Sequence, residues 1–342
     1  MKCHAKQGRL KKETTAKPIM KLVKFLAFLV PKVCGPGAPL IVACLISFGL
    51  PPAYGNQSST VRVGIVVSKN IRPYLEAVQG LESGLSDNSD VKTQVFNLEK
   101  LDDKERVDLF RGQGVKEFGL FVAVGPEAAL AVWKGIGKED ASRIYFMVLN
   151  PEKVLGPKAR GCGIPLNIPV QTQIEMIGRG LPSVRRLGLL YDPELNSAFF
   201  RTAAGAASFS DLTVVPLRVS SKKDISSVLK RQGKDMDALW LIPDRTVISE
   251  SIVKYVIKEA FLSKLPVIGY NRFFYETGAA LAFVFDYKEL GQQCAQKALR
   301  ILSGDACLDT PPLFHVWINE GVAEKLGLRP SDKYLPPIIL GP

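Results

Sequence analysis

Several polar residues of this sequence stand directly after short apolar runs, where they could contact a small molecule. A helix that begins after such a run presents free backbone N–H groups and a partial positive charge, which suit a carboxylate. Asp244 and Asp286 are the acidic residues best placed to pair with a ligand ammonium group. Tyr191, Tyr270 and Tyr287 each combine an apolar ring with a polar tip and could form walls of the same site. These residue types favour binding of a small zwitterion.

Each of these residues also has a purely structural explanation. Asp244 can cap the start of its own helix, and Asp286 can hold a connection between two lobes. Asn196 and Ser197 are as well suited to capping a helix as to touching a ligand. Lys69 suits a solvated rim, or else selects an anionic ligand. With those alternatives open, we expect ligand contacts from Ser68, Lys69, Gly125, Pro126, Asn150, Tyr191, Asn196, Ser197, Asp244, Thr246, Tyr270 and Asp286.

The sequence contains few residues that could carry out catalysis. Of the two histidines, only His315 lies beyond the first 55 residues, and it stands in an apolar predicted strand. The sequence has no Cys/His set with zinc spacing, no HExxH, no GxGxxG after its first strand and no GxxxxGK[ST] phosphate loop. Paired carboxylates are available, but no motif points to them. We expect a protein that is not an enzyme, with no cofactor and no metal.

The elements that must position these residues occur twice along the chain. The apolar run 61–68 returns as 184–191, and each predicts a buried strand followed by a helix. A later strand that runs into a polar turn also recurs, at 120–125 and at 238–242. Strands and helices alternate throughout, which predicts two α/β lobes with parallel sheets. A ligand is expected in the cleft between such lobes.

Four runs of residues carry a resemblance to a known family. They are Tyr191-Asp192-Pro193 with Asn196-Ser197, Pro-Asp-Arg-Thr-Val-Ile-Ser at 243–249, Gly-Ala-Ala-Leu-Ala at 278–282 and Asp-Tyr-Lys-Glu-Leu-Gly at 286–291. Together they resemble the substrate-binding proteins of ABC transporters, in the group that includes tryptophan and tyrosine binders. The resemblance covers roughly 61–330, nearly all of the chain after its leader.

The resemblance implies an α/β fold of the type I periplasmic-binding-protein kind. Two Rossmann-like lobes with parallel sheets would be joined by three crossover strands, near 163–166, 283–286 and 314–316. The first lobe would comprise 61–164 plus 287–311, and the second 165–285 plus 314–334.

Two departures from the family pattern concern the cleft. Many members carry a His-Pro pair after the first strand, whereas this chain reads Ile-Arg-Pro-Tyr at 71–74. Gly125 stands where a threonine is common. Both positions would face the ligand, so the family's usual amino acid need not be the ligand here.

The first 55 residues resemble an export leader. They contain nine of the 45 basic and one of the 33 acidic residues, so 56–342 carries a net charge of only about +4. This weak charge argues against a nucleic-acid partner. A basic stretch, an apolar run at 38–50 and the small residues Ala53 and Gly55 predict a signal peptide cleaved before Asn56, with Met1 or Met20 as the start. A lipid on Cys44 and an uncleaved anchor remain alternatives, and each places the folded part outside the cytoplasm, in the periplasm or its equivalent.

Three cysteines lie beyond the leader, and an odd number cannot all pair within one chain. Cys294 and Cys307 are candidates for a bridge, but Cys294 falls within a predicted helix. A small buried thiol is the favoured explanation for it.

These observations predict an exported solute-binding component of an ABC transporter. It would capture an amino acid or a similar small molecule by hinge closure and deliver it to permease subunits in the inner membrane, acting as a monomer. The alternative is the membrane-anchored sensing domain of a receptor or signalling system.

Overall fold

The computed structural model describes residues 60–110, 113–137, 141–156, 162–246, 249–331 and 337–340. The predicted cleavage site, the lipid site at Cys44 and the two candidate start residues lie outside the described residues. Across the described ranges, no helix combines the length and apolar character needed to cross a bilayer.

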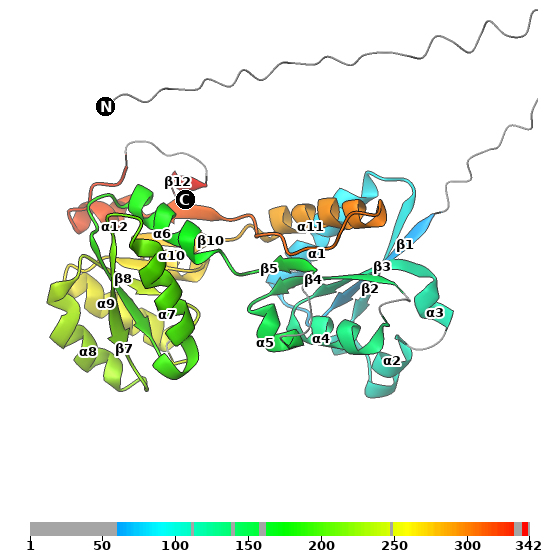
Figure 1. Ribbon diagram of the computed structural model, residues 1–342, viewed down its shortest axis with the longest axis horizontal. Coiled ribbons are helices and arrows are strands. Elements are labelled where there is room, and N and C mark those ends of the chain that lie inside the picture. The colour runs from blue at the N-terminus through cyan, green and yellow to red at the C-terminus, as the bar shows by residue number, and fades with distance from the viewer. Residues whose placement is uncertain are drawn as a thin grey trace, which may run out of the picture. The chain divides into compact units, whose positions relative to one another are not determined.

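Five parallel strands form the first sheet (Figure 1). Their order is β2-β1-β3-β4-β5, and their bounds are β1 (Val61–Val67), β2 (Val91–Asn97), β3 (Phe118–Val124), β4 (Ser142–Val148) and β5 (Gly163–Pro165). The intervening helices are α1 (Arg72–Ser86), η1 (Leu98–Lys100), α2 (Asp103–Asp108), α3 (Gln113–Lys116), α4 (Pro126–Gly135) and α5 (Pro151–Leu155). The sheet is therefore built from the repeated strand-helix units that the sequence predicts.

Successive side chains of a strand point to opposite faces of the sheet, and in the central strands the side chains on both faces are apolar. In β1, Val63, Ile65 and Val67 join the core beneath α1 and α11 (Tyr287–Leu302), whereas Val66 joins the core beneath α4. Because both faces are covered, the central strands β1, β3 and β4 are apolar over most of their length rather than alternating with polar residues.

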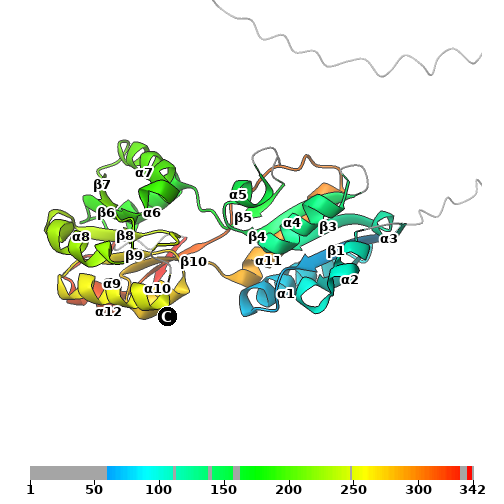
Figure 2. The same ribbon diagram turned by 90° about the horizontal axis from the view of Figure 1, so that it is seen from below.

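Seven strands form the second sheet, in the order β12-β11-β10-β9-β8-β6-β7. Their bounds are β6 (Arg186–Tyr191), β7 (Thr213–Arg218), β8 (Ala238–Leu241), β9 (Val267–Gly269), β10 (Leu281–Val284), β11 (His315–Ile318) and β12 (Ile338–Leu340). The helices of this part are α6 (Val170–Gly180), α7 (Pro193–Ala207), α8 (Asp224–Gln232), η2 (Gly233–Asp235), α9 (Glu250–Leu262), α10 (Arg272–Thr277) and α12 (Glu320–Lys325). Figure 2 shows the strands of this sheet between α7 on one side and α9 on the other.

One strand pair departs from the expected parallel arrangement. β11 runs antiparallel to β10, and the other pairs are parallel. The chain leaves the second sheet after β10, forms α11 on the first sheet and returns along 303–314, so it enters β11 in the opposite direction.

Helix α11 lies against α1 on the first sheet (Figure 1), and glycines allow the contact. A Cβ added to Gly291 would lie 2.2 Å from the Ala77 carbonyl oxygen, and one added to Gly80 would lie 2.0 Å from that of Lys288. The two helix backbones thus approach closer than any larger residue permits.

Three connections join the sheets, which confirms the expected crossover topology. The chain passes from β5 to α6 at 166–169, from β10 to α11 at 285–286 and from α11 to β11 at 303–314. Phe285, in the second connection, packs against the main core cluster of each sheet.

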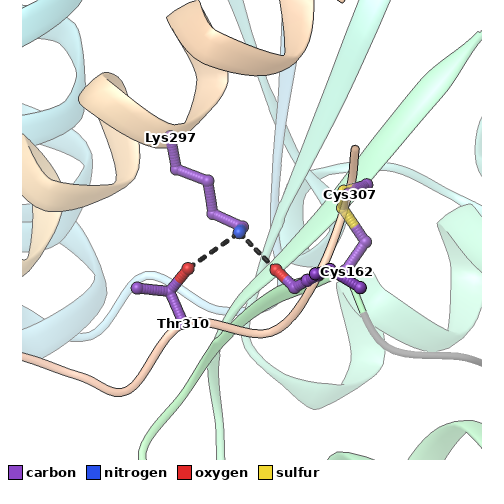
Figure 3. The surroundings of a disulfide bond; sticks show 5 residues. Cys162, Lys297, Cys307 and Thr310 are labelled. Atoms are coloured by element: carbon purple, nitrogen blue, oxygen red, sulfur yellow. Dashed lines mark hydrogen bonds between the residues drawn. A yellow bond between two sulfur atoms is a disulfide. The ribbon is translucent and has the colours of Figure 1, made fainter. Parts of the chain in front are cut away.

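The structure contains a disulfide that the sequence analysis did not propose. Cys307 forms a disulfide with Cys162, with a Cα–Cα distance of 5.1 Å, rather than with Cys294 (Figure 3). Cys294 is a free, fully buried thiol in α11, which confirms the favoured explanation. Burial raises the pKa of the Cys294 thiol to about 12, so it stays protonated.

Candidate functional site

Two adjoining hollows lie where the sheet connections meet, and Phe285 and Tyr287 line both of them. The larger, of about 580 Å³, is called the charged hollow. Its ionisable residues are Arg72, Glu76, Arg272, Glu276, Asp286 and His315. The smaller, of about 190 Å³, is called the apolar hollow.

The charged hollow is bordered by two ion pairs of the same design on different helices. In α1, Arg72 Nε lies 2.6 Å from Glu76 Oε1, and in α10, Arg272 Nε lies 2.9 Å from Glu276 Oε1. The Arg72 and Arg272 side chains are 81% and 59% exposed. Water therefore screens the attraction within each ion pair, and both pairs are weak. The Arg272 guanidinium also lies 5.5 Å from the ring centroid of Trp317. Weakly held charges of both signs are suited to exchanging partners with a polar ligand.

The apolar hollow is lined mainly by aromatic and aliphatic side chains, with amides at its edge. Its aromatic residues are Phe199, Tyr270, Phe283, Phe285 and Tyr287. Burial raises the pKa of Tyr270 to about 12, and burial also raises that of Tyr287. Both phenols therefore stay neutral near pH 7 and can donate hydrogen bonds. The amides of Asn167, Gln173 and Asn271 also border this hollow.

The expected residues of the first sheet mostly stabilise the start of α4. Ser68 Oγ accepts a hydrogen bond from the Ala128 N–H at 2.9 Å. Gly125 has φ 93°, and a Cβ there would lie 2.6 Å from Ser68 Oγ, so glycine is the residue that this turn admits. Pro126 is the first residue of α4, where a proline costs no hydrogen bond. Lys69 Nζ pairs with Glu127 Oε1 at 3.0 Å on the surface.

Asn150 is part of a reciprocal amide pair. Its backbone N–H donates to Asn167 Oδ1, and Asn167 Nδ2 donates to Asn150 Oδ1, each at 2.7 Å. This pair ties the end of β4 to the first sheet connection, next to the apolar hollow.

Asp244 is the centre of a hydrogen-bond network and is 1% exposed. Its carboxylate accepts from the Asp192 N–H at 2.8 Å, from Asn196 Nδ2 at 2.7 Å and from the Thr246 N–H at 2.8 Å. Thr246 Oγ1 donates in turn to Asp192 Oδ2 at 2.9 Å. In this structure the carboxylate joins the turns after β6 and β8 rather than facing either hollow.

Two further residues that were expected to contact a ligand instead contact neighbouring groups of the protein. Tyr191 is 2% exposed in the core and stacks on Phe200 with ring centroids 5.2 Å apart. Ser197 Oγ donates to the Pro193 carbonyl within α7.

Of the residues expected at the site, Tyr270, Asp286 and the expected wall residue Tyr287 line the hollows. Asp286 also caps α11, since its Oδ1 accepts from the N–H groups of Lys288 at 2.9 Å and Glu289 at 3.0 Å. Sequence reasoning did not select the paired charges of α1 and α10. The available signal was an Arg-x-x-x-Glu spacing just after two predicted strands, at 72–76 and at 272–276. In the described residues, no three His, Cys, Asp or Glu side chains are grouped to hold a metal ion.

Comparison with known proteins places this fold among solute-binding proteins. The chain is 22% identical over 168 residues to a tyrosine-binding protein of Clostridioides difficile (strain R20291), which is 47% of this chain and 48% of that protein. The chain thus matches about half the length of that curated relative.

Solved structures with the same fold cover more of the chain. A ligand-free, open substrate-binding protein with adhesive properties from Clostridium difficile matches with a TM-score of 0.67 and 19% identity, covering 82% of this chain and 99% of that one. The ABC domain from Streptococcus pneumonia, solved with L-Trp, matches with a TM-score of 0.52 and 21% identity, covering 79% of this chain and 96% of that one. These likenesses show a type I periplasmic-binding-protein fold.

A family model extends the comparison to the sequence itself. The model described as ABC transporter substrate binding protein matches residues 158–336, more than half of the 342 residues. Its span includes strands β6 to β11 of the second sheet, α11 and the turns that follow β6 and β8. On this match and this fold, the chain belongs to the ABC transporter substrate-binding protein family.

Proposed function

We propose that this protein is the solute-binding component of an ABC transporter and holds its solute across the charged and apolar hollows. The observation that carries the proposal is that the two hollows share Phe285 and Tyr287, so one small molecule can occupy both. Its polar head would lie among the paired charges and its apolar part among the aromatic rings.

The solute class that fits this arrangement is an amino acid or a similar small zwitterion. A carboxylate can replace Glu76 or Glu276 as the partner of an arginine, and an ammonium group can replace the arginine as the partner of a glutamate. The apolar hollow adds neutral phenols and amides but no charged side chain. The tyrosine-binding relative and the tryptophan-bound structure agree with this class.

Closure of the two lobes on the solute is the proposed mechanism. We take 61–164 with 287–311 as the first lobe and 165–285 with 314–334 as the second. Arg72 and Glu76 belong to the first lobe, and Arg272 and Glu276 to the second. A solute that contacts both lobes only in the closed state shifts the population toward that state.

The proposed partners are ABC permease subunits in the inner membrane, which would receive the solute from the closed protein. The protein would act outside the cytoplasm as a monomer, exported by its leader, and would carry out no catalysis. Nothing in the described residues favours the membrane-anchored sensor over this role.

A thermal-shift screen of residues 56–342 tests the proposal. The panel contains amino acids, purines, organic acids and sugars, each at a concentration far above its expected dissociation constant. A ligand at about 1,000 times its dissociation constant stabilises the folded state by about 4 kcal/mol, which is well above the detection limit. An amino acid hit supports the proposal, a hit confined to sugars or purines contradicts the solute class, and no hit contradicts the binding role.

A further inference from the structure

The third connection between the sheets is an irregular segment, residues 303–314, called the strap. It leaves the end of α11 and reaches β11 without forming a helix or strand of its own. Along its way it follows β5, the edge strand of the first sheet, where the Thr310 N–H donates to the Gly163 carbonyl at 2.9 Å. The strap therefore covers a sheet edge as well as joining the sheets.

Side chains of α11 fasten the strap by hydrogen bonds. Lys297 Nζ donates to the Leu308 carbonyl and, at 2.9 Å, to Thr310 Oγ1 (Figure 3). Lys297 is 9% exposed, so its ammonium group depends on these acceptors. Gln293 Nε2 donates to the Pro311 carbonyl at 2.8 Å, and Gln293 Oε1 accepts from the Leu313 N–H at 3.0 Å.

A covalent bond also fastens the strap, at Cys307, the residue next to Leu308. Cys307 is bonded to Cys162, which directly precedes β5 and therefore stands just before the first sheet connection (Figure 3). The bond joins residues 145 positions apart, so it links the start of β5, the strand that leads into the first connection, to the third connection. The reduced chain would have no bond of comparable strength at this place.

The disulfide and the hydrogen bonds of Lys297 and Gln293 are called the anchors of the strap. They shorten the part of the third connection that no contact holds. With Leu313 held by Gln293, only Phe314 separates the last anchored residue from β11. The other connections are also short, at 166–169 and at 285–286. Without its anchors the third connection would contain the full strap, and its end would be free to move relative to the other two.

We propose that the Cys162–Cys307 disulfide holds the strap in the position in which Lys297 and Gln293 can bind it, and that it thereby maintains the short third hinge connection and controls how tightly the two lobes close on a solute. The proposal rests on the proposed function, in which closure retains the solute. Reduction by a dithiol converts the bond to two thiols, and the dithiol transfers two electrons and two protons and closes to its own disulfide. The reduced strap then relies on hydrogen bonds alone, those of Lys297 and Gln293 and the one from the Thr310 N–H to the Gly163 carbonyl. As these bonds open, the hinge lengthens and samples more lobe orientations.

Hydrogen exchange followed by mass spectrometry measures release of the strap without any solute. In the reduced wild type and in Cys162→Ser/Cys307→Ser, we expect exchange over 303–314 to become about tenfold faster, with α1 and α11 still protected. Lys297→Met, measured with the disulfide intact, gives a smaller acceleration because one anchor is lost. Cys294→Ala is the matched control, since it removes a thiol from the same core but no bond, and it should exchange like the oxidised wild type.

Small-angle X-ray scattering of the same samples measures the hinge. We expect a broader distribution of interatomic distances for the two proteins without the disulfide. Unchanged exchange would mean that the hydrogen bonds hold the strap by themselves, and unchanged scattering with a released strap would mean that the strap does not govern the hinge. Either result overturns the inference.

The solute measurement separates this inference from the proposed function. The panel compound with the largest thermal shift is titrated into the oxidised and reduced proteins, and we expect about threefold weaker binding after reduction. Equal affinity in the two states overturns the inference. A panel without any hit refutes the proposed function, whereas exchange and scattering still decide whether the disulfide controls the hinge.

Discussion

Substitution of Gly291 by alanine tests the close packing of α11 on α1, which holds the returning helix on the first sheet. The added Cβ would lie 2.2 Å from the Ala77 carbonyl oxygen and 2.6 Å from the Leu81 nitrogen. Both atoms belong to the α1 backbone, so no side-chain rotation relieves the overlap and the helices must move apart.

The expected loss of stability follows from two opposing contributions. Overpacking of a well-packed core costs about 1–3 kcal/mol, and a backbone clash falls at the upper end of that range. Alanine in a helix interior returns about 1 kcal/mol relative to glycine. The net destabilisation is about 2 kcal/mol, which lowers the melting temperature by roughly 4–8 °C in a protein of this size.

Gly205→Ala is the matched control, because Gly205 also lies inside a helix, α7, but has no atom within 4 Å of the added Cβ. It should stabilise the protein by about 0.5–1 kcal/mol. Thermal and urea unfolding followed by circular dichroism measure both variants. If Gly291→Ala raised the melting temperature as Gly205→Ala does, the inferred approach of α1 and α11 would be wrong.

Four further predictions concern the site and the core. Asp244→Asn should cost about 1–3 kcal/mol in urea unfolding, because one amide oxygen cannot accept all three hydrogen bonds of the carboxylate; unchanged stability would show that the network is dispensable. Burial raises the pKa of Tyr270 from 10.0 to about 12, so its contribution to stability is complete below pH 10 and is lost as the pH rises toward 12. Unfolding between pH 9 and 12 should therefore show a shallower decline in Tyr270→Phe, and an identical decline would contradict burial of the phenol. The Cys294 thiol, with a pKa of about 12, should resist iodoacetamide at pH 8 until the protein is denatured, so labelling of the native protein would argue against its burial. Arg272→Gln should weaken binding of a zwitterionic solute by about tenfold in calorimetry, whereas Lys254→Gln, which removes a similar surface ion pair outside the hollows, should not; equal effects would place the solute elsewhere.

Much of the fold could be predicted because its signals are local. A strand that is covered on both faces must be apolar over its whole length, so β1 and β6 stand out as similar runs at 61–67 and 186–191. Asp286 was expected to contact a ligand or to hold a connection between the lobes, and the structure shows that it also caps α11 through the N–H groups of Lys288 and Glu289. The three connections then followed from the order of these elements and from the family resemblance.

The functional residues were harder to predict, because a turn residue can point toward the solvent or into the protein. Asp244 is placed at the end of a strand, as expected, but its carboxylate is enclosed by groups from its own turn and from the turn and helix start that follow β6. Two of its three hydrogen-bond partners are remote in the sequence, Asn196 at 48 positions and Asp192 at 52, and no local pattern predicts which acidic residue receives them.

The sequence by itself determined the strand-helix alternation, the duplication and the family, because burial and capping act on neighbouring residues. Tertiary structure decided which distant groups meet. It pairs Cys162 with Cys307 and leaves Cys294 buried alone, although Cys294 is much nearer to Cys307 in the chain. It also brings the ion pairs of α1 and α10 to one hollow. The physical reason is that such contacts depend on how the chain returns from one sheet to the other, and that path is set by the packing of α11 on α1 rather than by any local stretch of residues.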